Sequence, residues 1–105
     1  MPIRSQTQLR VACLQRCFED GSAARQVQIG AALEHAAARG SRLALLPELH
    51  QGPYFCQRED TGNFAGAEVI PGPTTDRLGD LARATGLVIV GSLFERRAAG
   101  VYHNT

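Results

Sequence analysis

The sequence contains no lysine and no tryptophan, and all 11 of its basic residues are arginine. Its formal net charge is +1, so it lacks the charge excess that would favour nucleic acid or an anionic membrane as a partner. It also lacks any apolar run near the roughly 20 residues that a bilayer requires, and its start, MPIRSQTQLR, lacks the apolar segment of a secretory signal. We therefore expect a cytoplasmic protein with no nucleic-acid or membrane partner.

Cysteine is scarce, and its pattern is not that of a disulfide framework. Cys13, Cys17 and Cys56 are odd in number and form no CxxC pair, which is typical of thiols in a reducing compartment. Together with the histidines they match no zinc-ligand spacing, so we expect no metal and no cofactor. We expect Cys13 to face the core, Cys17 to lie on a loop, and Cys56 to be a packing or pocket-wall residue and not a nucleophile.

The first half of the chain predicts a β-α-β unit in one small domain. Residues 8–15 are β-prone, and the Ala-rich segment 23–39 predicts a helix, capped by Ser22 and ended by Gly40. The continuous apolar run 42–47 predicts a strand covered on both faces, as in a parallel sheet.

The expected helix carries an apolar stripe that two sets of residues can supply. Val27, Ala31 and Ala36 recur near three- and four-residue spacing, and Ile29 with Leu33 can take the place of Ala31 in this stripe. Either set would pack on a sheet, so the sequence leaves the choice of buried face open.

The second half predicts a long loop followed by a helix and a hairpin. Residues 48–73 have no period and are rich in glycine and proline, which is typical of a functional surface loop. Residues 74–85 predict a helix ended by Gly86, residues 87–97 a third strand, and residues 101–105 its hairpin partner. The order predicts an α/β fold with helices against a sheet.

Glu48 is the main candidate for chemistry. It follows the expected strand 42–47, and functional residues of α/β proteins gather at the carboxyl ends of strands. Pro47 stiffens the exit from the strand, and the neighbouring Leu49 and Tyr54 could partly desolvate the carboxylate, which suits a general base. The alternative is that Glu48 merely caps a turn or pairs with an arginine.

Five segments in order carry a resemblance to a known family: LALLPEL, GPYFCQ, AEVIPGPTTDRLGDLA, LVIVGSLFER and VYHNT. They resemble the N-terminal third of the carbon-nitrogen hydrolase (nitrilase) superfamily, and GPYFCQ resembles the N-carbamoylputrescine amidases in particular. The resemblance implies a four-layer α-β-β-α sandwich. Residues 1–105 would then be the N-terminal fragment of a single domain, and we expect the full-length protein to be a homo-oligomer.

The resemblance also implies a catalytic glutamate, lysine and cysteine. Glu48 matches the glutamate, which acts as general base, whereas the lysine and the nucleophilic cysteine would follow residue 105. Tyr54, Phe55 and Gln57 match the loop that borders the substrate, although they could equally anchor that loop to the sheet. The implied substrate is a small carbamoyl or amide compound, most of all N-carbamoylputrescine, cleaved to putrescine, carbon dioxide and ammonia.

Other polar residues receive structural interpretations. We expect Glu59, Asp60 and Glu68 to be solvated loop charges, and Glu95 to be solvated, paired with a neighbouring arginine, or in support of Glu48. Asn104 is expected to end or orient the hairpin, because asparagine readily bonds its own backbone.

Three other functions stay open. The first is another amidase of the family or an N-carbamoyl amino acid hydrolase. The second is a nucleotide-binding module, although QRCFEDGSA offers only Gly21 where such a module needs a glycine-rich turn. The third is a non-catalytic truncated protein that pairs with another chain through its exposed strand edges.

We predict that the 105-residue chain alone is inactive. A general base without its nucleophile and its oxyanion partner should give almost no specific rate enhancement, because members of a catalytic unit act together. The measurement is ammonia release from N-carbamoylputrescine by the purified chain, and turnover above that of a protein-free control would contradict the prediction.

Overall fold

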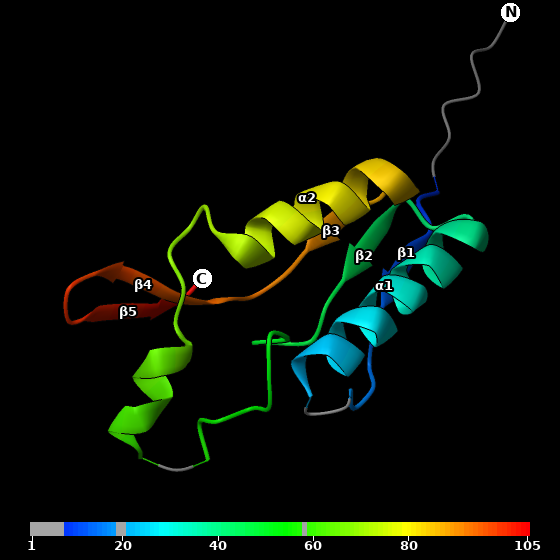
Figure 1. Cartoon of the computed structure of the whole chain (residues 1–105). Coiled ribbons are helices and arrows are strands. Elements are labelled where there is room, and N and C mark those ends of the chain that lie inside the picture. The colour runs from blue at the N-terminus through cyan, green and yellow to red at the C-terminus, as the bar shows by residue number, and fades with distance from the viewer. Residues whose placement is uncertain (1–7, 19–20, 58) are drawn as a thin grey trace, which may run out of the picture.

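The computed structural model describes residues 8–18, 21–57 and 59–105. The helices and strands follow in the order β1 (Val11–Cys13), α1 (Ser22–Ala38), β2 (Leu43–Leu45), the 3₁₀ helix η1 (Thr61–Gly66), α2 (Pro73–Thr85), β3 (Val88–Val90), β4 (Phe94–Ala98) and β5 (Val101–Asn104) (Figure 1). This order confirms the expected α/β class.

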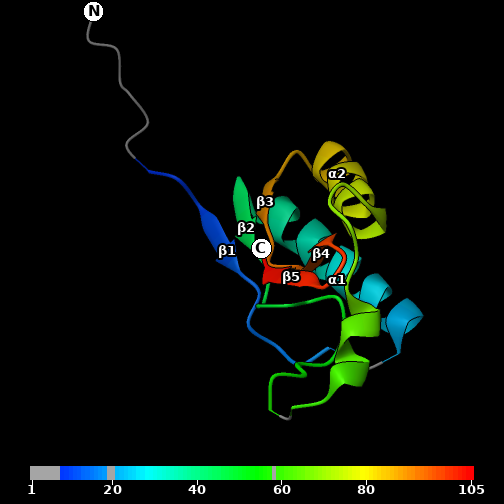
Figure 2. The ribbon, with the colours of Figure 1, turned by 90° about the vertical axis from the view of Figure 1, so that its left-hand side faces the viewer.

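The strands β1, β2 and β3 form a parallel sheet with β2 in the middle. Connections between parallel strands are right-handed as a rule, and both connections here step in the same direction along the sheet. The helices α1 and α2 therefore lie on the same face of the sheet, as Figure 2 shows.

The register of the sheet separates a covered face from a bare one. The covered face carries the paired row Ala12, Ala44 and Ile89, which belongs to the core or packs against it. The bare face carries the rows Val11, Leu43, Val88 and Cys13, Leu45, Val90. Leu45 is 43% exposed and Val88 is 61% exposed, so the prediction of a strand covered on both faces is wrong for this chain. Cys13 is exposed as well, so the prediction that it faces the core is also wrong.

The core lies between α1 and the covered face. Ile29, Leu33 and Ala36 are buried, and Leu33 is fully buried, so the second of the two possible stripes is the one that packs on the sheet. Val27 is 71% exposed and points away from the core. Arg25 is also buried, which the apolar pattern did not predict.

Glycine residues flank the helices, whereas Ser22 is not the N-cap of α1 that the sequence predicts. Gly21, not Ser22, is the residue that precedes α1, and Ser22 begins the helix. Gly86 ends α2 in the left-handed conformation at φ 71°, where a side chain would be strained. In the described ranges, neither helix combines the length and the apolar character needed to cross a membrane.

The segment expected as one strand over 87–97 is divided into two. The chain leaves β3 at Gly91, where an added Cβ would lie 3.4 Å from Leu78 and 3.5 Å from His50. It then enters the antiparallel pair β4 and β5, which confirms the expected hairpin. The hairpin lies beyond the end of the parallel sheet at which β3 finishes (Figure 1).

We predict that Leu33→Ala destabilises the chain by about 2–5 kcal/mol, because it empties a fully buried position in the core. Urea denaturation gives the free energy of unfolding. The matched control is Val27→Ala on the exposed face of the same helix, which should change that free energy by less than about 0.5 kcal/mol. Equal losses in the two variants would contradict the assigned buried face.

Candidate functional site

Glu48 lies just past the carboxyl end of β2, the central strand of the parallel sheet. Its side chain is exposed, so the expected desolvation by apolar neighbours is wrong for this chain. The carboxylate is nevertheless held in place, because its Oε1 accepts a hydrogen bond of 2.6 Å from Nδ2 of Asn104. The alternative that Glu48 pairs with an arginine is not seen in the described residues.

The turn after Glu48 has an unusual backbone. Leu49 is in the left-handed region at φ 51° and its side chain is buried, with 4% exposed. A residue with a side chain adopts this region at a cost of about 1–3 kcal/mol, and such residues cluster at functional sites. The amide N–H of Leu49 donates to Oγ of Ser92 at 3.3 Å, which helps to hold the turn.

A pocket of about 300 Å³ adjoins Glu48, and we call it the Glu48 pocket. Its lining includes Tyr54 and Gln57, so the structure brings together three of the four site residues expected from the sequence. A hydrogen bond with the Cys56 side chain, followed by the electrostatic effects of Cys56 and Glu48, raises the pKa of Tyr54 above its ordinary value. The Tyr54 hydroxyl therefore stays protonated at neutral pH and can donate or accept a hydrogen bond.

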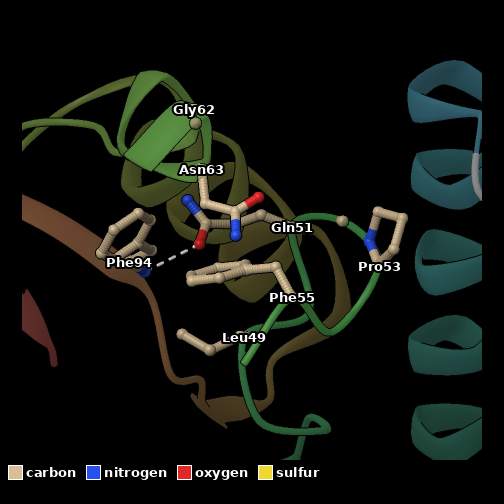
Figure 3. Close-up of a pocket in the computed structure, with 9 residues that line it drawn as sticks. Leu49, Gln51, Pro53, Phe55, Gly62, Asn63 and Phe94 are labelled. Atoms are coloured by element: carbon tan, nitrogen blue, oxygen red, sulfur yellow. Dashed lines mark hydrogen bonds between the residues drawn. The ribbon is translucent and has the colours of Figure 1, made fainter. Parts of the chain in front are cut away.

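Phe55, the fourth expected site residue, lies elsewhere. Its ring packs 4.7 Å from the ring of Phe94, and both residues line a neighbouring pocket of about 380 Å³ (Figure 3). Phe94 belongs to an aromatic cluster with Phe64 and Tyr102. Phe55 thus fits the alternative that the sequence left open, a hydrophobic anchor for the loop.

The loop that carries these residues is fixed by Glu68. Its carboxylate accepts hydrogen bonds from the N–H of Thr74 at 2.8 Å, from the Thr74 hydroxyl at 2.7 Å and from Nε2 of Gln51 at 2.9 Å. Oε1 of Gln51 accepts in turn from the N–H of Phe94 at 2.9 Å (Figure 3). The expectation that Glu68 is a solvated charge is therefore wrong, since it joins the loop, α2 and β4.

The environment of Glu68 also sets its protonation. Burial pushes its pKa upward, but the hydrogen bonds from Thr74 and Gln51 and the nearby His50 outweigh burial, so the pKa lies below its ordinary value. Glu68 is therefore ionised over the neutral range and can accept all three hydrogen bonds.

Glu95 is buried, with 6% exposed, so the expectation of a solvated side chain is wrong. Its Oε1 accepts a hydrogen bond of 2.7 Å from the hydroxyl of Thr105 and lies 3.8 Å from Arg97, which confirms the alternative of a pair with a neighbouring arginine. Within the described part of the chain, Glu95 makes no hydrogen bond with Glu48.

His50 is a buried residue that the sequence analysis did not single out. It is 5% exposed, lines the Glu48 pocket, and its Nδ1 has no hydrogen-bond partner among the described residues. Burial lowers the pKa of His50 below 6.5, although a hydrogen bond with the Ser92 backbone opposes this. The imidazole is therefore neutral at pH 7.

The three cysteines are free and exposed, and Cys56 lies near Tyr54 on the loop surface. Within residues 8–18, 21–57 and 59–105, no group of three or more histidine, cysteine, aspartate or glutamate side chains could hold a metal ion.

Comparison with known proteins gives consistent matches over nearly the whole chain. The profile of the carbon-nitrogen hydrolase family matches residues 10–105. An N-carbamoylputrescine amidase of Solanum lycopersicum is 33% identical over 96 residues, which is 90% of this chain and 32% of that protein. A citrullinase of Francisella tularensis is 29% identical over 97 residues, which is 91% of this chain and 34% of that protein.

A solved structure shares the fold. The crystal structure of a carbon-nitrogen hydrolase from Helicobacter pylori superimposes with a TM-score of 0.79 at 29% identity, covering 91% of this chain and 33% of that one. This chain therefore spans about a third of the length of the relatives that it matches.

We predict that acid destabilises the chain in two stages. Because the folded pKa of His50 is lowered, the unfolded state binds more protons, and the free energy of unfolding should begin to fall as the pH drops below about 6.5. The lowered pKa of Glu68 adds a second loss, which begins below about 4.5 and is complete once the pH has passed the folded pKa. Urea denaturation across this pH range measures both stages.

Two variants test the loss of unfolding free energy that begins below about pH 4.5. Glu68→Gln should not show this loss, whereas Glu34→Gln, at an exposed position on α1, should still show it. An unchanged acid loss in Glu68→Gln would contradict the assignment.

Proposed function

This chain belongs to the carbon-nitrogen hydrolase family, and we propose that it is the N-terminal part of an amidohydrolase in which Glu48 is the general base. The proposed reaction is hydrolysis of a linear, non-peptide C–N bond. The substrate that we favour is N-carbamoylputrescine, which with one water gives putrescine, carbon dioxide and ammonia.

The observation that carries the proposal is the placement of Glu48. Its carboxylate stands at the carboxyl end of the central parallel strand, at the start of a turn in which Leu49 is strained. It is held by a 2.6 Å hydrogen bond from Asn104, a residue 56 positions away in the sequence. A strained turn and a long-range contact at one carboxylate are more than a solvated surface glutamate requires.

The chemistry follows from what a fixed carboxylate can do. Glu48 would accept the proton of a cysteine thiol, and the resulting thiolate would attack the carbonyl carbon of the substrate. A lysine would stabilise the negative oxygen of the tetrahedral intermediate. Since this chain contains no lysine, we propose that both the lysine and the cysteine come from polypeptide that follows it.

The bare face of the sheet supports a longer domain. Its two apolar rows are of the kind that another sheet covers in a sandwich. We propose that the following polypeptide supplies that second sheet and completes the four-layer arrangement. We also propose that the complete protein is a cytoplasmic homo-oligomer, and the free thiols fit a reducing compartment.

The Glu48 pocket supports a small, linear substrate. Tyr54 and Gln57 line it beside Glu48, so an aromatic face and a side-chain amide adjoin the carboxylate. An amide can hydrogen-bond both the carbonyl and the N–H groups of a ureido substrate. Phe55 anchors the loop against Phe94, and we propose that it also meets the far end of the substrate, because its pocket shares Leu49, Gly52 and Pro53 with the Glu48 pocket.

A second candidate function has an observation in its favour. Arg16 also lines the Glu48 pocket, and a guanidinium group suits a carboxylate better than a distal ammonium. An N-carbamoyl amino acid presents such a carboxylate. This makes an N-carbamoyl amino acid hydrolase the alternative to an N-carbamoylputrescine amidase.

We predict that Glu48→Gln lowers kcat/KM of the complete hydrolase by about 10²-fold to 10⁴-fold, because the amide cannot accept the proton. Ammonia release measures the rate. Assays with N-carbamoylputrescine and with an N-carbamoyl amino acid, run side by side, separate the two candidate functions.

Glu59→Gln is the matched control for this experiment, since it makes the same change at an exposed position on the same loop and should leave the rate unchanged. The proposal fails if Glu48→Gln and Glu59→Gln have the same activity.

A further inference from the structure

Two polar residues contact the turn at Glu48 but take no part in the proton transfer proposed above. Asn104 lies on β5, and Ser92 lies on the link between β3 and β4. We propose that Asn104 and Ser92 are positioning residues that fix the Glu48 carboxylate for proton transfer. This inference rests on the proposed role of Glu48 as general base.

The hydrogen bonds between these residues run in a single direction. A carboxylate that is ready to take a proton only accepts hydrogen bonds, so the Asn104 amide must present its NH₂ group to Glu48. The amide oxygen then faces Ser92, whose hydroxyl donates to it. The same Ser92 oxygen accepts from the N–H of Leu49, so each partner has the donor or acceptor that its neighbour requires.

These three hydrogen bonds form a closed ring with the turn at Glu48 and Leu49. Leu49 follows Glu48 directly, so the chain of hydrogen bonds leaves the turn at the Leu49 amide and returns to it at the Glu48 carboxylate. The ring therefore fixes the backbone and the side chain of the turn together. A strained residue such as Leu49 persists only where its surroundings hold it, and Ser92 supplies one such contact.

The ring also leaves one carboxylate oxygen available. Asn104 engages Oε1, and Oε2 has no hydrogen-bond partner among the described residues. A base held through one oxygen can present the other to its proton donor in a fixed direction. Asn104 therefore acts on the orientation of Glu48, not on the substrate.

Asn104 is itself held by the hairpin. It pairs with Phe94 across β4 and β5, and the next residue, Thr105, exchanges backbone hydrogen bonds with Leu93, of which the Thr105 N–H to Leu93 oxygen bond is 2.9 Å. Asn104 is the last residue of β5, which agrees with the expectation that it ends the hairpin. Its side chain contacts Ser92 and Glu48, so it also connects the hairpin to the end of β2.

The test uses the complete hydrolase with Asn104→Asp, which keeps the size of the side chain but replaces the NH₂ donor with a charged oxygen that repels the Glu48 carboxylate. We expect kcat to fall by about 10-fold to 100-fold with KM unchanged, because Glu48 is misoriented while the pocket is intact. Ser92→Ala should give a smaller loss, and Ser92→Thr, which keeps the hydroxyl, should restore the rate.

A double variant tests whether Ser92 acts through Asn104. Adding Ser92→Ala to Asn104→Asp should cause no further loss of kcat, since the link is already broken. If the kcat losses of the two single variants multiply in the double variant, Ser92 does not act through Asn104 and the proposal is overturned. The control is Val101→Ala, an exposed position on β5, which should leave kcat unchanged.

The outcomes separate this inference from the proposed function. If Glu48→Gln is inactive while Asn104→Asp keeps full kcat, the positioning role is overturned and the base remains. If Glu48→Gln is active, the proposed function and this inference both fail. A loss in Asn104→Asp that disappears at a lower temperature, together with a lowered Tm, would show a merely structural role and would also overturn the inference.

Discussion

The pairing of β2 with a parallel strand on each side is the constraint on which the other features depend. Because the two connections step in the same direction, both helices must cover the same face of the sheet. That arrangement buries Leu33 against Ala44 in one core and leaves the opposite face bare. It also fixes the end of β2, so that Glu48 leaves the sheet beside the start of the β4–β5 hairpin.

The site depends on contacts that converge on a loop with little regular structure. Glu68 joins the loop to α2 and, through Gln51, to β4. Asn104 joins the end of β2 to β5. The loop after β2 has little regular structure, but side-chain hydrogen bonds hold it near both of its ends. Such contacts allow a loop to keep a carboxylate in a fixed position.

Local signals in the sequence predict both α-helices and β2, but not the division of residues 87–97 into two strands or the 3₁₀ helix η1. The apolar run before Pro47 identified β2 and the position of Glu48, and Gly86 identified the end of α2. The bare face was missed because apolar periodicity shows that a strand is apolar, not which layers are present to cover it. The contact between Asn104 and Glu48 was missed because a pair 56 residues apart has no local pattern. The burial of His50 and Glu95 depends likewise on neighbours that arrive late in the chain.

The bare face has a thermodynamic consequence for the isolated chain. Side chains such as Val88 and Leu45 that remain partly hydrated in the native state contribute less to the change in hydration on unfolding than fully buried side chains do. The heat-capacity increment of this chain should therefore fall below the roughly 12–15 cal/mol/K per residue of ordinary globular domains. Its stability curve would be correspondingly flat, with a weak dependence on temperature around the maximum.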